Sequence, residues 1–273
     1  MNEPLLHPRT RLQVDAFLHQ SAHSLLITGT DGIGKYYLAQ SIAAQLSDES
    51  ITLVPPVDKT TITIEQIREL YAITKTGGNL TIIIKDAQIM GTEAQNAFLK
   101  LLEEPPKNTT FILTATSSAS VLQTIRSRCQ HIDVVPPPKT DVLSLAQQQN
   151  TRLSDLQLQS LLSSSRGLPG TFFQFLNDDQ AATYHTAILA EAKAFYGGTS
   201  YQRYVLCAQH TYQKQWALDV MDILSIITEA LLKTSASKQT LLQQADILQE
   251  TTFAISERSA NVKIQLTHLV EQL

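Results

Sequence analysis

The sequence predicts a three-layer α/β domain with a mostly parallel sheet, followed by a small helical module and a helical bundle. Strand-like and helix-like segments alternate as far as about residue 135, which is typical of a parallel sheet covered by helices. The prolines from Pro136 to Pro138 then form a stiff connector that breaks this alternation. Beyond them the strand signals end, and apolar residues recur at helical spacing.

Short apolar runs mark the expected strands of the sheet. Such runs, rich in Ile, Val and Thr, are typical of strands in a parallel sheet that is covered by helices. The expected strands are Ser24–Thr28, Ile51–Val54, Thr81–Ile84, Thr109–Thr116 and Gln130–Val135. The pattern of Thr81–Ile84 indicates a strand that is buried on both faces.

Apolar residues at helical spacing mark the segments between these strands. The expected helices are Lys35–Leu46, Thr63–Thr74 and Thr92–Leu102. In the last of them, Thr92 is placed to cap the helix, and Pro105 and Pro106 are placed to end it.

The second half of the chain predicts helices only. Two short amphipathic helices are expected at Thr140–Gln149 and Ser154–Ser164, and the turn at Gly167–Gly170 leads into a further short helix. From about residue 179 onward we expect four or five longer helices. The predicted domains are therefore 1–137, 138–178 and 179–273.

Composition excludes several classes of protein. The 273 residues carry a formal net charge of −4, so a strongly basic nucleic-acid-binding protein is not indicated. The two cysteines, Cys129 and Cys207, are too few for a disulfide framework or a four-cysteine zinc site. The first residues show no signal-peptide pattern, and no apolar run is long enough to span a membrane. We therefore expect a cytoplasmic protein in a reducing environment, with no membrane contact.

Residues 25–37, LLITGTDGIGKYY, have the pattern of a phosphate-binding loop that follows a strand and opens a helix. Gly29, Gly34 and Lys35 fit G-x-x-x-x-G-K, and Gly32 lies between the two glycines. Backbone N–H groups of residues 30–35 would bind phosphates, and Lys35 would reach the β- and γ-phosphates. A vestigial loop that only makes the turn is the alternative, so ATP binding stays open at this point.

Both positions that hold Mg²⁺ in such sites are altered. Tyr36 stands where a Ser or Thr hydroxyl would bind the ion, and Lys85 stands where a carboxylate would hold it after the strand Thr81–Ile84. The ammonium group of Lys85 would repel a divalent cation. Asp86 is either a displaced ligand or an ordinary surface carboxylate. We therefore expect no metal site and no ATP hydrolysis by this chain alone.

Long motifs between Asp86 and Gln130 are more specific than the phosphate loop. They are Ala94, Asn96, Ala97, Leu99-Lys100, the run from Leu102 to Pro106 (LEEPP), Phe111-Ile112-Leu113 and the run from Ile125 to Cys129 (IRSRC). In these residues the chain closely resembles bacterial DNA polymerase III clamp-loader subunits, which belong to the AAA+ superfamily. The resemblance implies an AAA+ core over 1–137, a helical lid over 138–178 and a collar for oligomerisation over 179–273.

Within that family, the chain resembles the delta-prime class more than the ATP-hydrolysing tau/gamma class. The hydrolysing class is expected to keep a small hydroxyl after the loop lysine, Asp-Glu after the next strand, and a sensor-2 arginine in the lid. This chain has Tyr36, Lys85-Asp86 and Gly170 at those places. Many relatives also insert a four-cysteine zinc module, but residues 47–80 contain no cysteine. The resemblance thus implies a non-hydrolysing stator that holds no zinc and requires no cofactor.

Arg128, in the motif Ser127-Arg128-Cys129, is the residue to which the resemblance gives a role in ATP hydrolysis. The resemblance implies that it is an arginine finger, which acts in trans on ATP bound by a neighbouring subunit. An ordinary surface ion pair is the alternative role of this arginine. The partners implied are tau/gamma-type ATPase subunits and a delta-type subunit. The sliding clamp and primed DNA would be contacted through the complex.

Two other functions compete with this interpretation. A self-sufficient P-loop ATPase or nucleotide kinase predicts Mg²⁺-dependent turnover by the isolated chain, with loss of turnover in Lys35→Ala. An adaptor with the clamp-loader fold that acts outside replication predicts no association with the replicative ATPase subunit.

Overall fold

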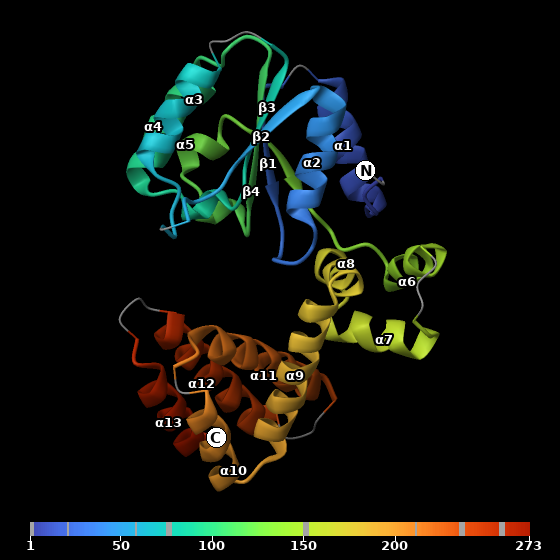
Figure 1. The fold of residues 1–273 in the computed structure, drawn as a ribbon, viewed down its shortest axis with the longest axis vertical. Coiled ribbons are helices and arrows are strands. Elements are labelled where there is room, and N and C mark those ends of the chain that lie inside the picture. Colours follow the sequence, from blue (N-terminus) through green and yellow to red (C-terminus); the bar gives the residue numbers. More distant parts are fainter. Residues whose placement is uncertain are drawn as a thin grey trace. The chain divides into compact units, whose positions relative to one another are not determined.

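The computed structural model describes residues 3–20, 22–57, 59–74, 78–149, 153–210, 212–234, 238–256 and 260–273 (Figure 1). The chain divides into two compact units, Met1–Asn177 and Asp178–Leu273, hereafter unit 1 and unit 2. Within the described ranges, no helix is both long enough and apolar enough to cross a membrane.

Unit 1 is built on a five-stranded sheet in which every pairing is parallel. The strands are β1 (Ser24–Thr28), β2 (Glu49–Leu53), β3 (Leu80–Ile84), β4 (Thr109–Ala115) and β5 (Gln130–Asp133). Their order across the sheet is β2-β3-β4-β1-β5. The parallel α/β sheet that the sequence predicts is therefore confirmed.

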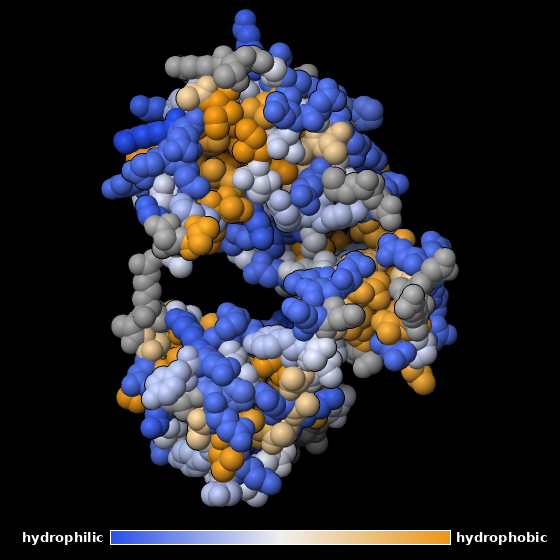
Figure 2. Space-filling model, in the orientation of Figure 1, coloured by the Kyte–Doolittle hydropathy of each residue, from blue (hydrophilic) through white to orange (hydrophobic). Residues whose placement is uncertain are grey.

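The edge strand β2 begins earlier than the apolar pattern indicates. It starts at Glu49 rather than at Ile51, because Glu49 and Ser50 pair with β3 while their side chains stay exposed. An edge strand needs less apolar surface than a central one, so its polar beginning gives no apolar signal. In Figure 2, apolar side chains are visible on unit 1 over the region where Figure 1 shows β2.

Helices cover both faces of this sheet (Figure 1). The helices of unit 1 are α1 (Pro8–His19), α2 (Lys35–Leu46), α3 (Ile64–Ile73), α4 (Thr92–Glu103), α5 (Gln123–Arg126), α6 (Lys139–Gln148), α7 (Asp155–Ser164) and α8 (Pro169–Asn177). Helices α1 and α2 lie on one face, and α3, α4 and α5 lie on the other.

Alternating side chains of the central strands pack into two separate hydrophobic cores, one on each face of the sheet. Leu25 and Ile27 of β1 pack with α1 and α2, whereas Leu26 packs with α3 and α4. All five residues of β1 and all five of β3 are buried. Phe98 of α4 meets Phe111 of β4 edge to face, with ring centroids 5.2 Å apart. This double burial explains the continuous apolar runs in the sequence.

Two local features differ from the sequence-based expectation. Gly91, not Thr92, is the N-cap residue of α4, and Thr92 is the first helical residue, so the predicted side-chain cap is wrong. Helix α1 has no counterpart among the predicted helices. Its apolar face is narrow, with Thr10, Val14 and Phe17 as its buried residues, which gives a weak periodic signal.

The last helices of unit 1 have a small core of their own. Val142, Ala146, Leu158, Leu162 and Phe172 pack together between α6, α7 and α8. Unit 2 consists, in its described part, of α9 (Asp179–Gly197), α10 (Ser200–Gln209), α11 (Lys214–Thr234), α12 (Lys238–Ser256) and α13 (Val262–Gln272). Its core is centred on α11, where Trp216 is buried and donates its ring N–H to Glu191 at 2.5 Å.

We expect Phe98→Ala to lower the free energy of unfolding of unit 1 by about 3–5 kcal/mol, because a buried aromatic side chain is lost and a cavity remains. Urea denaturation followed by far-UV circular dichroism measures this change. Trp216 is the only tryptophan of the chain, so its fluorescence reports unit 2 separately. A shift within about 0.5 kcal/mol, as expected for the exposed Leu12→Ala control, would contradict the packing described here.

Candidate functional site

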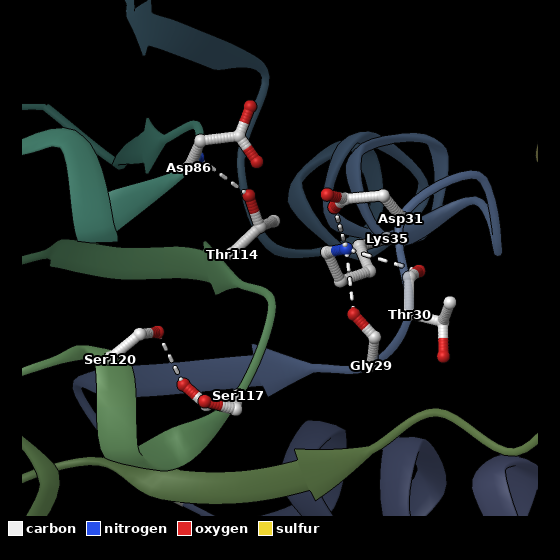
Figure 3. A network of polar contacts seen from close by, with 8 residues as sticks. All are labelled: Gly29, Thr30, Asp31, Lys35, Asp86, Thr114, Ser117 and Ser120. Carbon is white, nitrogen blue, oxygen red and sulfur yellow. Dashed lines mark hydrogen bonds and ion pairs between the residues drawn. The ribbon is translucent and has the colours of Figure 1, made fainter. Parts of the chain in front are cut away.

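The predicted site residues of the phosphate loop and of β3 lie at the carboxyl edge of the sheet. Gly29 to Gly34 follow β1, Asp86 lies two residues after the end of β3, and Thr114 lies near the end of β4 (Figure 3). Carboxyl ends of parallel strands meet at one edge, where α/β proteins place their ligand sites. The structure therefore brings these residues together.

Three glycines give the loop its shape. Gly29, Gly32 and Gly34 have φ values of +151°, +80° and +99°. Residues other than glycine rarely adopt such values. Gly34 is the N-cap residue of α2, so Lys35 is the first residue of that helix. The geometry of the loop thus depends on the glycines from which the sequence motif was identified.

Lys35 turns back onto its own loop, as Figure 3 shows. Its side chain is only 6% exposed. The ammonium donates to the carbonyl oxygens of Gly29 at 2.8 Å and Thr30 at 3.2 Å, and to the carboxylate of Asp31 at 2.9 Å. In this arrangement the positive charge is already satisfied by oxygens of the loop, so a phosphate would have to replace these contacts. Phosphate binding by Lys35 stays a prediction.

The first turn of α8 lies directly on the loop. The backbone N–H of Thr171 donates to the carbonyl oxygen of Gly32 at 2.9 Å. A Cβ atom placed on Gly170 would lie 2.6 Å from that oxygen and 2.7 Å from the backbone nitrogen of Gly34. Real Cβ atoms do not come so close, so Gly170 permits this contact and an arginine there would not fit. The helix covers part of the backbone that would otherwise face a phosphate.

Tyr36 and Lys85, the residues that the sequence analysis places at the two expected Mg²⁺-binding positions, lie against each other. The Lys85 ammonium lies 5.3 Å from the centroid of the Tyr36 ring, a cation–π arrangement. The Tyr36 hydroxyl is within 3.2 Å of the Thr52 hydroxyl and accepts a hydrogen bond from the side chain of Gln40. The ammonium of Lys85 and the ring of Tyr36 therefore occupy the space between the start of α2 and the end of β3. Among the described residues, no group of three or more His, Cys, Asp or Glu is placed to hold a metal ion.

Asp86 has a left-handed backbone, with φ of +55°. Its N–H donates to the hydroxyl of Thr114 at 2.9 Å, which links the end of β3 to the end of β4. Aspartate tolerates this conformation better than most residues, because its short side chain makes local hydrogen bonds. Thr114 was not predicted as a site residue, since a threonine inside a strand carries no distinguishing signal.

Arg128 lies where the strands begin (the amino edge of the sheet), whereas the phosphate loop lies where they end (the carboxyl edge). Its carbonyl accepts a hydrogen bond from the hydroxyl of Ser24, the first residue of β1, whereas Gly29 follows the last residue of that strand. A strand rises about 3.3 Å per residue, so the two positions are separated by about 16 Å along β1. The structure therefore does not bring Arg128 together with Lys35.

The guanidinium of Arg128 is held within its own subunit. It forms an ion pair with Glu103 of α4 at 2.8 Å, and it donates to the carbonyl oxygen of Thr124 at 2.9 Å. The side chains of Arg128 and Glu103 are 36% and 49% exposed. The surface ion pair that the sequence left as an alternative is thus present. The pairing was not foreseen, because the two residues are separated by 25 positions in the sequence.

Cys129, the residue after Arg128, packs against the core below α3 and α4. Burial raises the pKa of its thiol to about 11, and the hydroxyl of Ser24 opposes this shift. Such a thiol stays protonated at neutral pH and is a poor nucleophile. Cys129 is therefore a packing residue of this core.

Sequence comparison finds that the chain is similar to subunits of DNA polymerase III. A family model described as "DNA polymerase III, delta subunit" matches residues 49–138. The subunit delta' of Escherichia coli is 29% identical over 194 residues, which cover 68% of this chain and 58% of that protein. The subunit delta' of Yersinia pestis is 31% identical over 132 residues, covering 46% of this chain and 39% of that protein. The chain therefore spans about two fifths to three fifths of the length of these relatives.

A relative named as a gamma subunit and two solved structures extend the comparison. The subunit gamma of Buchnera aphidicola is 32% identical over 134 residues, covering 40% of this chain and 37% of that protein. A DNA polymerase III gamma subunit-related protein of Thermotoga maritima has a TM-score of 0.62 at 18% identity, covering 96% of this chain and 97% of that one. The RuvB branch migration motor of the same organism has a TM-score of 0.52 at 13% identity, covering 73% of this chain and 78% of that one. These likenesses show that the chain shares the fold of these two proteins.

We expect Gly170→Ala to separate the start of α8 from the phosphate loop, because the added methyl group would overlap with backbone atoms of Gly32 and Gly34. Hydrogen exchange at the amide of Thr171 should accelerate by at least about tenfold, which corresponds to a loss of about 1.4 kcal/mol in local protection. Gly91→Ala is the matched control, since a Cβ there meets nothing within 4 Å. Equal exchange in the two variants would contradict the contact.

We expect the thiol of Cys129 to react slowly with iodoacetamide in the folded protein. With a pKa raised from 9.0 to about 11, its thiolate fraction at pH 8 is about 100-fold below that of an ordinary cysteine. Unfolding releases this proton between pH 9 and 11, so the stability contributed by the protonated thiol falls as the pH rises through that window. Peptide mapping by mass spectrometry measures the labelling. Rapid modification in the native state would contradict the burial.

Proposed function

The chain is related in sequence to the delta' subunits of bacterial DNA polymerase III, and on this basis we propose that it is a clamp-loader subunit that supplies Arg128 in trans. The observation that carries the proposal is the placement of Arg128. It stands at the amino edge of the sheet, about 16 Å along β1 from the phosphate loop of its own chain. An arginine in that position serves a nucleotide held by a neighbouring chain rather than its own.

The chemistry of a guanidinium suits this role. Arginine stays charged at all physiological pH values, and its planar donors bind phosphate oxygens in pairs. Placed beside the γ-phosphate of a neighbour's ATP, Arg128 would stabilise the negative charge that develops as the phosphoryl group is transferred. Its backbone is held by Ser24 and by a hydrogen bond to Ile125, so the side chain extends from a defined base.

We also propose that the chain does not hydrolyse ATP by itself. Three features support this proposal. Tyr36 and Lys85 occupy the positions of the Mg²⁺ ligands and contact each other. The ammonium of Lys35 is engaged by its own loop. The start of α8 covers the loop backbone, and Gly170 stands near the place of the sensor-2 arginine.

The proposed partners follow from the relatives. A gamma subunit of DNA polymerase III shares sequence with this chain, so tau/gamma-type subunits are the proposed neighbours that hold ATP. Unit 2 would pack with the corresponding helices of those subunits and of a delta-type subunit. The assembly would open the sliding clamp and place it on primed DNA, and this chain would act as its stator.

The test is the ATPase activity of the reconstituted complex in the presence of clamp and primed DNA. We expect Arg128→Ala to lower the stimulated rate by about 10³-fold, the lower end of the range for arginine fingers, while the complex still assembles. Arg128→Lys should recover little of the lost ATPase rate, because lysine cannot donate two parallel hydrogen bonds to one phosphate. Exposed Arg9→Ala, far from the sheet edge in question, is the matched control.

Two outcomes would contradict the proposal. An assembled Arg128→Ala complex with the wild-type rate would exclude the trans role. Mg²⁺-dependent turnover by the isolated chain, abolished by Lys35→Ala, would return the active site to the loop at Gly29–Lys35 and favour a self-sufficient ATPase.

A further inference from the structure

We propose that Glu103 restrains Arg128: its carboxylate holds the guanidinium on its own subunit until the phosphates of a nucleotide on the neighbouring subunit displace it. This inference rests on the proposed trans role of Arg128. It assigns a positioning function to Glu103, which lies in the motif LEEPP at the end of α4.

The guanidinium is bound from two helix ends at once. Glu103 is the last residue of α4, and its carboxylate accepts from Nη2 of Arg128 at 2.8 Å. Nη1 donates to the carbonyl oxygen of Thr124 in α5 at 2.9 Å and lies 3.5 Å from the hydroxyl of Ser127. The contacts from both terminal nitrogens fix the direction of the side chain, so a phosphate has to replace at least the contact with Glu103.

The charges around Arg128 favour this folded-back arrangement. The carboxylate of Glu103 forms an ion pair with the guanidinium of Arg128 at 2.8 Å. Glu103 also lies at the carboxyl end of α4, where unpaired carbonyl groups add a partial negative charge. Together they offset much of the positive charge that the finger would present to a phosphate. A bound nucleotide has a higher negative charge than one carboxylate, so it can compete for the same donors.

The strength of the pair suits a contact that exchanges. Both side chains are more than a third exposed, at 36% and 49%, and surface pairs of this kind bias a side chain by no more than about fivefold. A buried pair would hold the arginine too tightly to be released. An exposed pair selects one side-chain direction and still yields to a polyphosphate. The expected consequence is a modest increase in the ATP concentration needed for activity.

Glu104 provides a matched control. It is the neighbouring residue, it is also exposed, and it is the C-cap residue of α4. In the described part of the chain, its side chain forms no hydrogen bond or ion pair with Arg128. Glu103→Gln and Glu104→Gln remove the same charge from the same helix end, so a difference between them reports the contact rather than the general field.

The experiment uses the complete reconstituted complex with clamp and primed DNA. We expect Glu103→Gln to lower the KM for ATP by about two- to fivefold with little change in kcat, because the finger no longer has to leave its carboxylate. Glu104→Gln should keep the wild-type KM. Glu103→Asp keeps the carboxylate but shortens the side chain by one methylene group. Its KM for ATP should lie between those of the wild type and Glu103→Gln. Size-exclusion chromatography verifies assembly of every variant.

A double-mutant comparison separates restraint from a structural effect. In the Arg128→Ala background, Glu103→Gln should cause no further change in KM, because the partner of the carboxylate is gone. Equal KM values for the Glu103→Gln and Glu104→Gln complexes would overturn the restraint, as would a raised KM or a loss of kcat in Glu103→Gln. If Arg128→Ala retains the wild-type rate, the proposed function itself fails. If Arg128→Ala loses the rate but the Glu103 variants keep the wild-type KM, the proposed function stands and only the restraint by Glu103 is rejected.

Discussion

The burial of β1 in the middle of a parallel sheet is the constraint on which the site depends. Neighbours on both sides fix its register, with Leu25 opposite Ile112 of β4 and Gln130 of β5. Because every strand runs the same way, the loop after β1 and the residues before β5 must lie at opposite edges. The length of one strand therefore separates the phosphate loop from Arg128.

The loop at Gly29–Lys35 has a structural role within unit 1. Its glycines let the backbone turn sharply, and the carbonyl of Gly32 accepts a hydrogen bond from the N–H of Thr171 in α8. Lys35 satisfies carbonyl groups that point inward from the same turn. These contacts join the loop that follows β1 to the first turn of α8.

Electrostatics distinguishes the two edges of the sheet. At the carboxyl edge, Lys35 is nearly buried and its charge is satisfied by three oxygens of its own loop. At the amino edge, Arg128 is exposed and its main carboxylate partner is exchangeable. Desolvation makes the first arrangement costly to open, whereas solvent lowers the cost of opening the second. The proposed division between an idle loop and an active arginine follows from this difference.

The sequence by itself determined the parallel sheet, the helices on its faces and the loop at Gly29–Lys35. These features follow from local patterns: continuous apolar runs, helical spacing and glycines that permit positive φ. The motifs around Leu102–Pro106 and Arg128 indicated the resemblance to DNA polymerase III subunits that the sequence comparison also finds. Only the tertiary structure decided which groups meet: Tyr36 with Lys85, Gly170 with the loop, and Arg128 with Glu103. Those pairs come from separate elements, and their contact depends on how helices pack on the sheet, which no short-range pattern encodes.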